Sequence, residues 1–314
     1  MAKEQACPMK KTSIGGQALI EGVMMRGPEK TAMAVRHVSG EMIVEQTENA
    51  VSNRPKWTKW PLIRGVFGFV DSLRYGYKCL MRSAELSGLE EEDKPKTEEE
   101  EKKQHRLTNT LMVVAAVLGV GLSLVLFMWL PIQLFSWLTK ALPALEQPYF
   151  RGLFEGVLRI VIFVVYLLLV SRMKDIRRTF QYHGAEHKSI FCYEKGLPLT
   201  VENVRAQSRL HPRCGTSFTI LMLLVGIIIS ILIPITVPWL RTVVKLLLLP
   251  LSVGIGYELI KLAGRKDNRF TRIISTPGMW LQHLTTEEPS DDMIECAVAA
   301  LEAVIPQDPE ADNW

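Results

Sequence analysis

The chain has 314 residues, of which 48% are hydrophobic and 22% are charged, and its formal net charge is +4. That much apolar sequence beside so many charges indicates that the apolar residues are concentrated in segments. The small net charge gives no reason to expect a nucleic-acid partner. The five cysteines are odd in number and form no CxxC pair, which argues against a disulfide-stapled fold.

Residues 1–89 are expected to form a small cytoplasmic region that contains β-structure. Gly15-Gly16 and Gly27-Pro28 are turn signals, so the glycine-rich segment around them is expected to form tight turns. Residues 31–47 alternate in polarity on either side of Ser39-Gly40. This alternation predicts a β-hairpin.

Residues 56–85 are predicted to form an amphipathic helix. Basic side chains lie opposite an apolar stripe, and Trp57 and Trp60 come just before it. The stripe is formed by Leu62, Val66, Phe69, Val70, Leu73, Tyr77 and Leu80. A basic amphipathic helix introduced by tryptophans is typical of a helix that lies flat at a membrane interface. The alternative is a soluble helix packed on the hairpin.

The rest of the chain is predicted to be a membrane domain, residues 107–263, between a charged linker, 90–106, and a C-terminal cytoplasmic segment, 264–314. The linker cannot bury a core. Four apolar runs follow it, each as long as the roughly 20 residues that one span needs. They cover residues 107–138, 153–171, 217–240 and 243–263. The predicted fold is therefore mainly α, a multi-pass membrane protein with four transmembrane helices.

The distribution of Lys and Arg predicts the orientation of these spans. The connection 131–152 contains only two basic residues, Lys140 and Arg151, whereas the loop 172–216 is rich in them. By the positive-inside rule, the loop and both termini face the cytoplasm. Membrane lipids are then the expected partners, with other membrane proteins as further candidates. The oligomeric state stays open.

The loop 172–216 contains the strongest chemical signal in the sequence. His183 and His187 are four residues apart and share one face if the segment is helical. With Glu186 between them they give the order H-x-x-E-H, the inverted form of a zinc-protease signature. In that chemistry the two histidines hold the metal and the glutamate, here Glu186, handles the proton of the attacking water.

His211 and Cys214 are candidates to complete a metal site. A fold-back of the chain before the third span would bring them near His183 and His187. Zinc, the divalent metal favoured here, accepts both nitrogen and sulfur ligands. One of the two residues would give an open site with room for a catalytic water, and both would give a closed structural site. Glu258 is a lower-ranked third ligand.

Two readings do not require a metal. The histidines could belong to an ordinary membrane-proximal helix that contacts lipid headgroups. The charges near the spans could belong to a transport path. Among these charges, Glu155 and Arg159 are one helical turn apart and are expected to pair, and Gly152 and Gly156 form a small-xxx-small step suited to close helix packing.

Four segments of the chain resemble the YqhQ-like family of uncharacterised bacterial membrane proteins, which are often labelled metal-dependent enzymes. They are Gly15–Pro28, Tyr182–Lys188, His211–Phe218, and Leu284–Thr286 with Glu288-Pro289; Glu287 between them departs from the family motif, which commonly has a basic residue there. The resemblance extends over nearly the whole chain. It implies a location in the bacterial inner membrane and is compatible with a metal site.

The sequence thus leaves two hypotheses. The first is a metal-dependent membrane enzyme of the hydrolase class, with Glu186 as its base. The second is a non-catalytic protein: a scaffold or biogenesis factor for other membrane proteins, or a transporter. The sequence names no substrate.

Overall fold

The computed structural model describes residues 11–49, 54–89, 98–265, 268–308 and 311–312. The chain divides into two compact units, each built from separate stretches of sequence. Unit 1 comprises Met1–Glu90, Leu168–Leu221 and Gly256–Trp314. Unit 2 comprises Glu91–Leu167 and Met222–Ile255.

A four-stranded antiparallel sheet forms the base of unit 1. Its strands are β1 (Gly15–Leu19), β2 (Gly22–Arg26), β3 (Lys30–Arg36) and β4 (Met42–Glu48), paired in chain order. The predicted hairpin corresponds to β3 and β4, and Gly27-Pro28 turns the chain between β2 and β3. The sequence did not predict β1 and β2, because the glycines of β1 are also turn formers.

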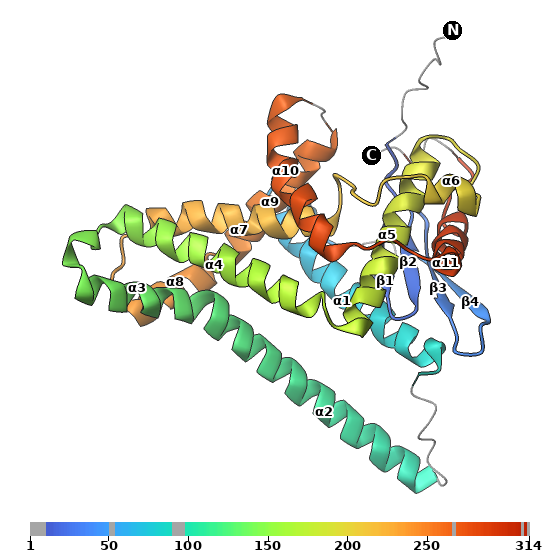
Figure 1. Ribbon diagram of the computed structural model, residues 1–314, viewed down its shortest axis with the longest axis horizontal. Helices are drawn as coiled ribbons and strands as arrows, with labels where there is room; N and C mark the ends of the chain where they lie inside the picture. Colours follow the sequence, from blue (N-terminus) through green and yellow to red (C-terminus); the bar gives the residue numbers. More distant parts are fainter. Residues whose placement is uncertain (1–10, 50–53, 90–97, 266–267, 309–310, 313–314) are drawn as a thin grey trace. The chain divides into compact units, whose positions relative to one another are not determined.

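Helices cover both faces of this sheet (Figure 1). On one face, α5 (Lys174–Glu194) and α11 (Asp291–Glu302) bury a core that includes Val23 and Tyr182. On the other face, α1 (Ile63–Ser87) packs through Cys79 against Leu19. The remaining helices wholly within unit 1 are η1 (Lys56–Lys59), α6 (Val201–Arg205) and α10 (Arg269–Thr285).

Helix α1 combines features of both readings of residues 56–85. It packs on the sheet through small buried residues such as Gly76 and Ser83. Much of its apolar stripe nevertheless stays exposed, with Val70, Leu73 and Tyr77 between 54% and 59% accessible. One face of the helix therefore packs on the sheet of unit 1, and another face is apolar and exposed.

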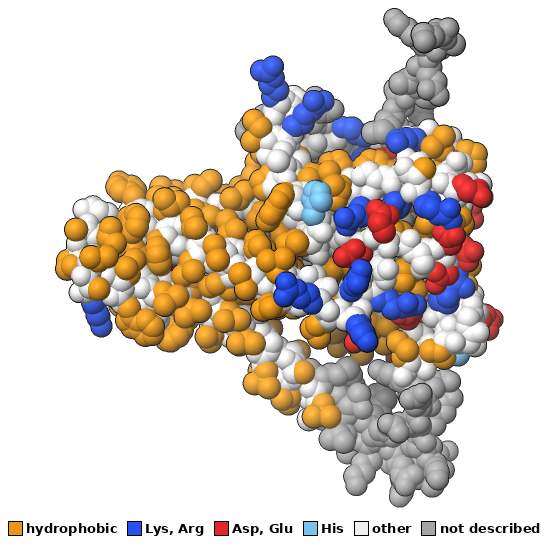
Figure 2. Space-filling model, in the orientation of Figure 1, with side chains coloured by type: hydrophobic (Ala, Val, Ile, Leu, Met, Phe, Trp, Pro, Cys, Tyr) orange, Lys and Arg blue, Asp and Glu red, His pale blue; other side chains and the backbone are white. Residues whose placement is uncertain are grey.

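Unit 2 consists of helices with apolar surfaces. In chain order they are α2 (Glu98–Leu124), the π-helical turn η3 (Val125–Trp129), α3 (Leu130–Ala141), η4 (Pro143–Leu145), α4 (Pro148–Val170), α7 (Gly215–Leu232), α8 (Pro238–Leu247) and α9 (Leu249–Arg265), with the ends of α4, α7 and α9 in unit 1. Figure 2 shows hydrophobic side chains over the surface of α3 and α4. Exposed residues such as Val117 and Leu118 extend this apolar surface along α2.

Among the described residues, three helical segments are long and apolar enough to cross a membrane, or four if α8 and α9 count as one bent span. The first two, Val113–Ala141 and Tyr149–Val170, correspond to predicted runs. The third is shorter than predicted, because α7 ends at Leu232, just before Pro234. The chain then bends by 45° where α8 meets α9.

The predicted linker and ion pair also differ from the structure. Residues 90–97 lie outside the described part of the chain, but α2 already begins at Glu98, as its run of good helix formers favours. The carboxylate of Glu155 bonds to Arg241 and Lys245 rather than to Arg159. The Arg159 Nε instead donates to the backbone oxygen of Phe127, 2.7 Å away.

Candidate metal centre

Helix α5 carries three of the predicted site residues. It begins at Lys174, with Asp175 in its first turn, and is followed by Gly196 in the left-handed region at φ 66°. This closely matches the helix expected from the sequence, whose end was predicted from Gly196 and Pro198. The helix places His183 and His187 on one side, with their ring centroids 4.4 Å apart.

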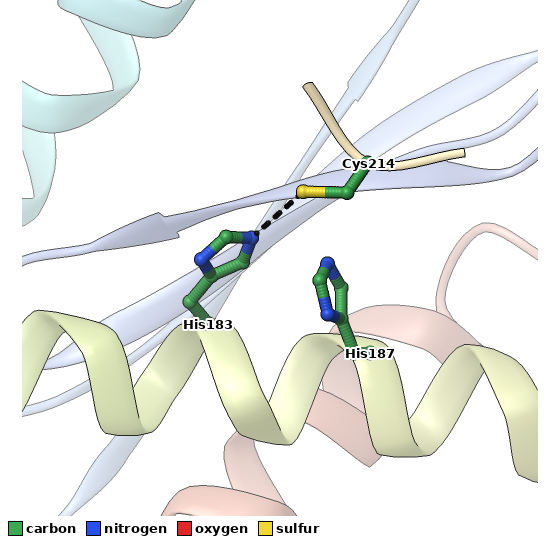
Figure 3. A group of neighbouring side chains, drawn as sticks. All are labelled: His183, His187 and Cys214. Carbon is green, nitrogen blue, oxygen red and sulfur yellow. Dashed lines mark hydrogen bonds between the residues drawn. The ribbon is translucent and has the colours of Figure 1, made fainter. Parts of the chain in front are cut away.

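Cys214 completes a group of three potential ligands. Both histidine rings project from α5 towards its sulfur, which comes from the loop before α7 (Figure 3). The ligand atoms of His183, His187 and Cys214 all lie within 4.8 Å of one another. Ligands of tetrahedral zinc stand roughly 3.3–3.6 Å apart for nitrogen–nitrogen and nitrogen–sulfur pairs. The group therefore needs only small side-chain movements to hold a metal ion.

Backbone carbonyls fix the orientation of both rings. The Nδ1 of His183 lies 2.8 Å from the backbone oxygen of Thr285, and the Nδ1 of His187 lies 2.5 Å from that of Arg209. Each Nδ1 must therefore be the protonated nitrogen, which leaves each Nε2 as the one with a free lone pair when the ring is neutral. A metal-bound histidine usually donates its other ring N–H to a carbonyl or carboxylate in this way, which fixes the orientation of the ring.

The Nε2 of His187 is buried and has no hydrogen-bond partner within the described residues. The whole residue is only 1% exposed. A buried acceptor without a donor is costly, so native structures rarely leave one unexplained. A metal ion between this nitrogen, Cys214 and His183 would supply the missing partner. The donor set thus fits a metal, and two imidazoles with a thiolate suit zinc in particular.

The charges within the group favour a thiolate at Cys214. Burial alone would raise the pKa of this thiol, but His183 and His187 together lower it well below its usual value. The Nε2 of His183 lies 3.2 Å from the sulfur. Burial would lower the pKa of His183, but Cys214, Glu186 and the Thr285 carbonyl raise it to about 9. A thiolate is the form of cysteine that binds metals.

Glu186 lies on the same side of α5, with one carboxylate oxygen 3.9 Å from the Nε2 of His183. The residue is 5% exposed, and burial raises its pKa despite the opposing effect of the two histidines. The backbone of Gly16 in β1 contacts its side chain so closely that a Cβ there would lie 2.8 Å from Glu186 Cγ. The glycine-rich strand therefore forms one wall of the site.

His211 lies next to the group but is not a member of it. Its ring centroid is 5.6 Å from that of His187. Its Nδ1 accepts from the backbone N–H of Arg213, and its Nε2 lies 3.5 Å from a carboxylate oxygen of Glu194. The His211 ring is therefore oriented towards the Glu194 carboxylate rather than towards the ligand group. Arg213 bonds to the same carboxylate. Glu258, the lower-ranked ligand, bonds instead to Arg64 in α1.

A cavity of about 680 Å³ opens beside the ligand group, within unit 1. Four consecutive residues of β1, Gly15 to Ala18, line it, although successive residues of a strand point to opposite faces of the sheet. Gln17 approaches Gly76 on the α1 side, while Gly16 approaches α5. The cavity therefore reaches both sides of β1, and residues before the strand, Ser13 and Ile14, line it as well. β1 is the first strand of the sheet, and no other strand of the described residues pairs with its outer edge.

Several residues of the site could not be found from local sequence. Gly16, Arg209, Thr285 and Glu194 act through contacts between segments that are far apart in the chain. The signal for two of them was present but unused: paired glycines inside a strand often mark a close backbone approach, and Thr285 belongs to a segment that carried the family resemblance.

Comparison with known proteins places the chain in a family. A family model described as "Protein of unknown function (DUF1385)" matches residues 60–307. The chain belongs to this family. It is also 35% identical over 310 residues to a Bacillus subtilis (strain 168) protein named "Uncharacterized protein YqhQ", covering 97% of this chain and 95% of that protein. The resemblance to YqhQ-like proteins is thereby confirmed. No solved structure matches the chain.

Proposed function

We propose that the protein is a multi-pass protein of the bacterial cell membrane and that unit 1 is a metal-dependent hydrolase at its cytoplasmic face. The apolar helices of unit 2 support the membrane location. The basic residues of the loop 172–216 support a cytoplasmic site and cytoplasmic termini. The exposed apolar stripe of α1 supports contact with membrane lipids, in the manner of an interfacial helix.

The buried Nε2 of His187 is the observation that carries the metal proposal. His183, His187 and Cys214 would hold the ion, most suitably zinc, and leave its fourth position open. His211 faces Glu194 and would support the site from outside the ligand set. An open position favours catalysis over a purely structural role.

Glu186 would be the general base. When bound, a zinc ion polarises substrate carbonyls and makes water a better nucleophile near neutral pH. Glu186 lies close enough to the ligand group to accept a proton from that water and to pass it to the leaving group. Its burial raises its pKa, which is the direction that suits a general base working near neutral pH.

The open edge of β1 favours a peptide as the substrate. The cavity follows this edge up to Gly16, which adjoins Glu186. An extended peptide could add to the strand through backbone hydrogen bonds. This would bring one of its peptide bonds next to the ligand group without demanding a particular sequence.

A second candidate uses the same residues without a metal. The 3.2 Å approach of His183 to Cys214 and the lowered pKa of the thiol are also the features of a Cys–His nucleophile. In that case the Nε2 of His187 would keep no hydrogen-bond partner among the described residues. The metal content of the protein separates the two candidates.

The first test is elemental mass spectrometry of detergent-purified protein that has met neither chelator nor a metal-affinity column. We expect about one zinc ion per chain in the wild type and in Glu186→Gln, and loss of the metal in His187→Ala and Cys214→Ser. A wild-type protein without metal would refute the metal site. It would favour the thiol candidate if iodoacetamide still blocked activity.

The second test is hydrolysis of a random-sequence peptide library, followed by mass spectrometry of the products. Glu186→Gln should keep the metal and lose about 10²–10⁴-fold in rate, the usual contribution of a general base. If the wild type and Glu186→Gln give the same products at the same rate, Glu186 is not catalytic. The non-catalytic scaffold, biogenesis-factor or transporter role would then be favoured.

A further inference from the structure

Unit 2 contains a smaller cavity, of about 160 Å³, that plays no part in the proposed hydrolase. Residues of η3, α4, α7 and the junction between α8 and α9 line it. Most of its walls are apolar, but Arg159 and Lys245 also line it. Two cationic side chains in such surroundings need an explanation, because burying an unneutralised charge is unfavourable.

Arg159 has one nitrogen that is not satisfied. Its Nε donates to the backbone oxygen of Phe127, whereas its Nη2 is buried and has no hydrogen-bond partner within the described residues. A guanidinium carries five N–H donors in a fixed plane. A buried donor without an acceptor is costly, so a bound acceptor at this nitrogen would be stabilising.

The charges around the cavity do not balance. Glu155 is 0% exposed and bonds to Arg241 through both carboxylate oxygens, at 3.0 Å each, and to Lys245. Arg241 is otherwise occupied by backbone oxygens, such as that of Ile233. One carboxylate thus faces three cations, counting Arg159, which leaves an excess of two positive charges. An anion would reduce this excess.

The backbone that lines the cavity is irregular on two sides. Phe127 and Met128 belong to the π-helical turn η3, and Leu248 is the residue at which α8 gives way to α9. π-Helical turns occur frequently at functional sites. Interrupted helices commonly form ligand sites near the middle of the bilayer. Both features meet at this cavity.

The depth of Arg159 agrees with such a site. It is eleven residues from either end of α4, Pro148 and Val170. At a helix rise of about 1.5 Å per residue, this is roughly 16 Å from each end. In a hydrocarbon core about 30 Å thick, Arg159 lies near the midplane.

We propose that this cavity binds the phosphate group of an anionic ligand, with Arg159 and Lys245 as its main contacts. A phosphate oxygen would accept from the Nη2 of Arg159, and the apolar walls would accommodate any hydrocarbon attached to the phosphate. Free inorganic phosphate is the expected source, because the phosphate of a phospholipid lies at the bilayer surface, about 15 Å from the midplane. A phospholipid whose headgroup is drawn into the cavity is the alternative that the test separates. This site is separate from the hydrolase site and does not depend on it.

The test is thermal unfolding of the full-length protein in detergent, delipidated and then titrated. Three additions are compared: phosphatidylglycerol, phosphatidylcholine and inorganic phosphate. We expect saturable stabilisation by phosphatidylglycerol or by phosphate, and none by phosphatidylcholine. Stabilisation by phosphatidylglycerol alone identifies a lipid ligand, and stabilisation by inorganic phosphate identifies a free anion.

Variants tie the effect to the cavity. Arg159→Gln should weaken binding about tenfold or more, because it removes a charge-assisted contact. Without ligand, its melting temperature should be equal to or above that of the wild type, because the substitution removes a buried charge. Arg177→Gln, an exposed arginine of α5, is the matched control and should bind normally. Gly226→Ala narrows the cavity without a clash, since its Cβ would lie 3.6 Å from Arg159, and should also weaken binding.

Two results would overturn the proposal. One is the absence of saturable stabilisation by either phosphate source. The other is equal binding by the wild type, Arg159→Gln and Gly226→Ala. If Arg159→Gln does not fold, Gly226→Ala alone decides, because it leaves every charge in place.

Discussion

At the scale of single residues, Gly16 shows how closely the sheet approaches α5. A Cβ at this position would lie 2.7 Å from the backbone oxygen of Met24 and 2.8 Å from the Cγ of Glu186. We expect Gly16→Ala to displace Glu186 and to destabilise the protein by about 1–3 kcal/mol, the usual cost of overpacking. Peptide hydrolysis should fall while the metal stays bound.

Gly15→Ala is the control for this substitution, because nothing lies within 4 Å of a Cβ at that position. Thermal unfolding, metal analysis and the hydrolysis assay should all leave it close to the wild type. Equal effects of the two substitutions would mean that the contact between Gly16 and Glu186 does not matter.

His211 decides whether the proposed metal centre is open or closed. Because its Nε2 faces Glu194, we expect His211→Ala to keep the metal and to lose stability, since a buried carboxylate loses a partner. Metal analysis beside thermal unfolding checks both effects. Loss of the ion in a folded variant would instead show a four-ligand, structural site.

Sequence patterns predicted only part of this site. The four-residue spacing was enough to place His183 and His187 on one helix face, because it depends on helix geometry alone. The prediction that Cys214 approaches the two histidines depended on a fold-back of the chain before the third span. His211-Pro212 suggested this fold-back, because proline interrupts a helix. The hydrogen bonds that the two histidines donate to the carbonyls of Thr285 and Arg209 depend on how distant segments pack. No local periodicity encodes such contacts.

At the scale of elements, hydropathy predicted the apolar helices better than their interruptions. The runs that became α4 and most of α2 and α3 were found because a span is a matter of length and composition. The break after Leu232 and the bend at Leu248 were missed. Apolar residues continue through both, so hydropathy does not detect them. Strand β1 was missed because its glycines are residues that also occur in turns, so the sequence was interpreted as a turn where the chain is extended.

The contact between α4 and α7 depends on small residues, as the spacing of Gly152 and Gly156 predicted. A Cβ at Gly152 would lie 2.5 Å from the Cα of Ile231, and one at Gly156 would lie 2.4 Å from a side-chain carbon of Ile227. We expect Gly152→Ala to lower stability by about 1–3 kcal/mol, because the backbone of α7 must move. Thermal unfolding in detergent measures this change.

Gly119 in α2 is a matched control, because nothing lies within 4 Å of a Cβ there. Gly119→Ala should be neutral or stabilising by up to about 1 kcal/mol, since alanine is the better helix former. If Gly152→Ala behaves in the same way, the two helices do not pack as described.

At the scale of the whole molecule, the proposed orientation can be tested by labelling single cysteines. The native cysteines among the described residues are buried and should not react. Cys7 lies outside the described residues, so the labelling experiment uses a Cys7→Ser background. We expect Glu146→Cys, in the loop between α3 and α4, to react with an impermeant maleimide in intact cells. Arg177→Cys in α5 should react only after permeabilisation. The opposite pattern would contradict cytoplasmic termini.

The two ends of the described chain meet in unit 1. The hydroxyl of Thr12 donates to the Asp312 carboxylate at 2.5 Å, and the backbone N–H of Ser13 bonds to the same residue. Helix α11, near the end of the chain, covers the sheet that is synthesised first. Every apolar helix of unit 2 therefore leaves the ribosome before the sheet can gain its final cover. The proposed enzyme would therefore be complete only after all of these helices have been synthesised, and a chain that stops before α11 would remain inactive.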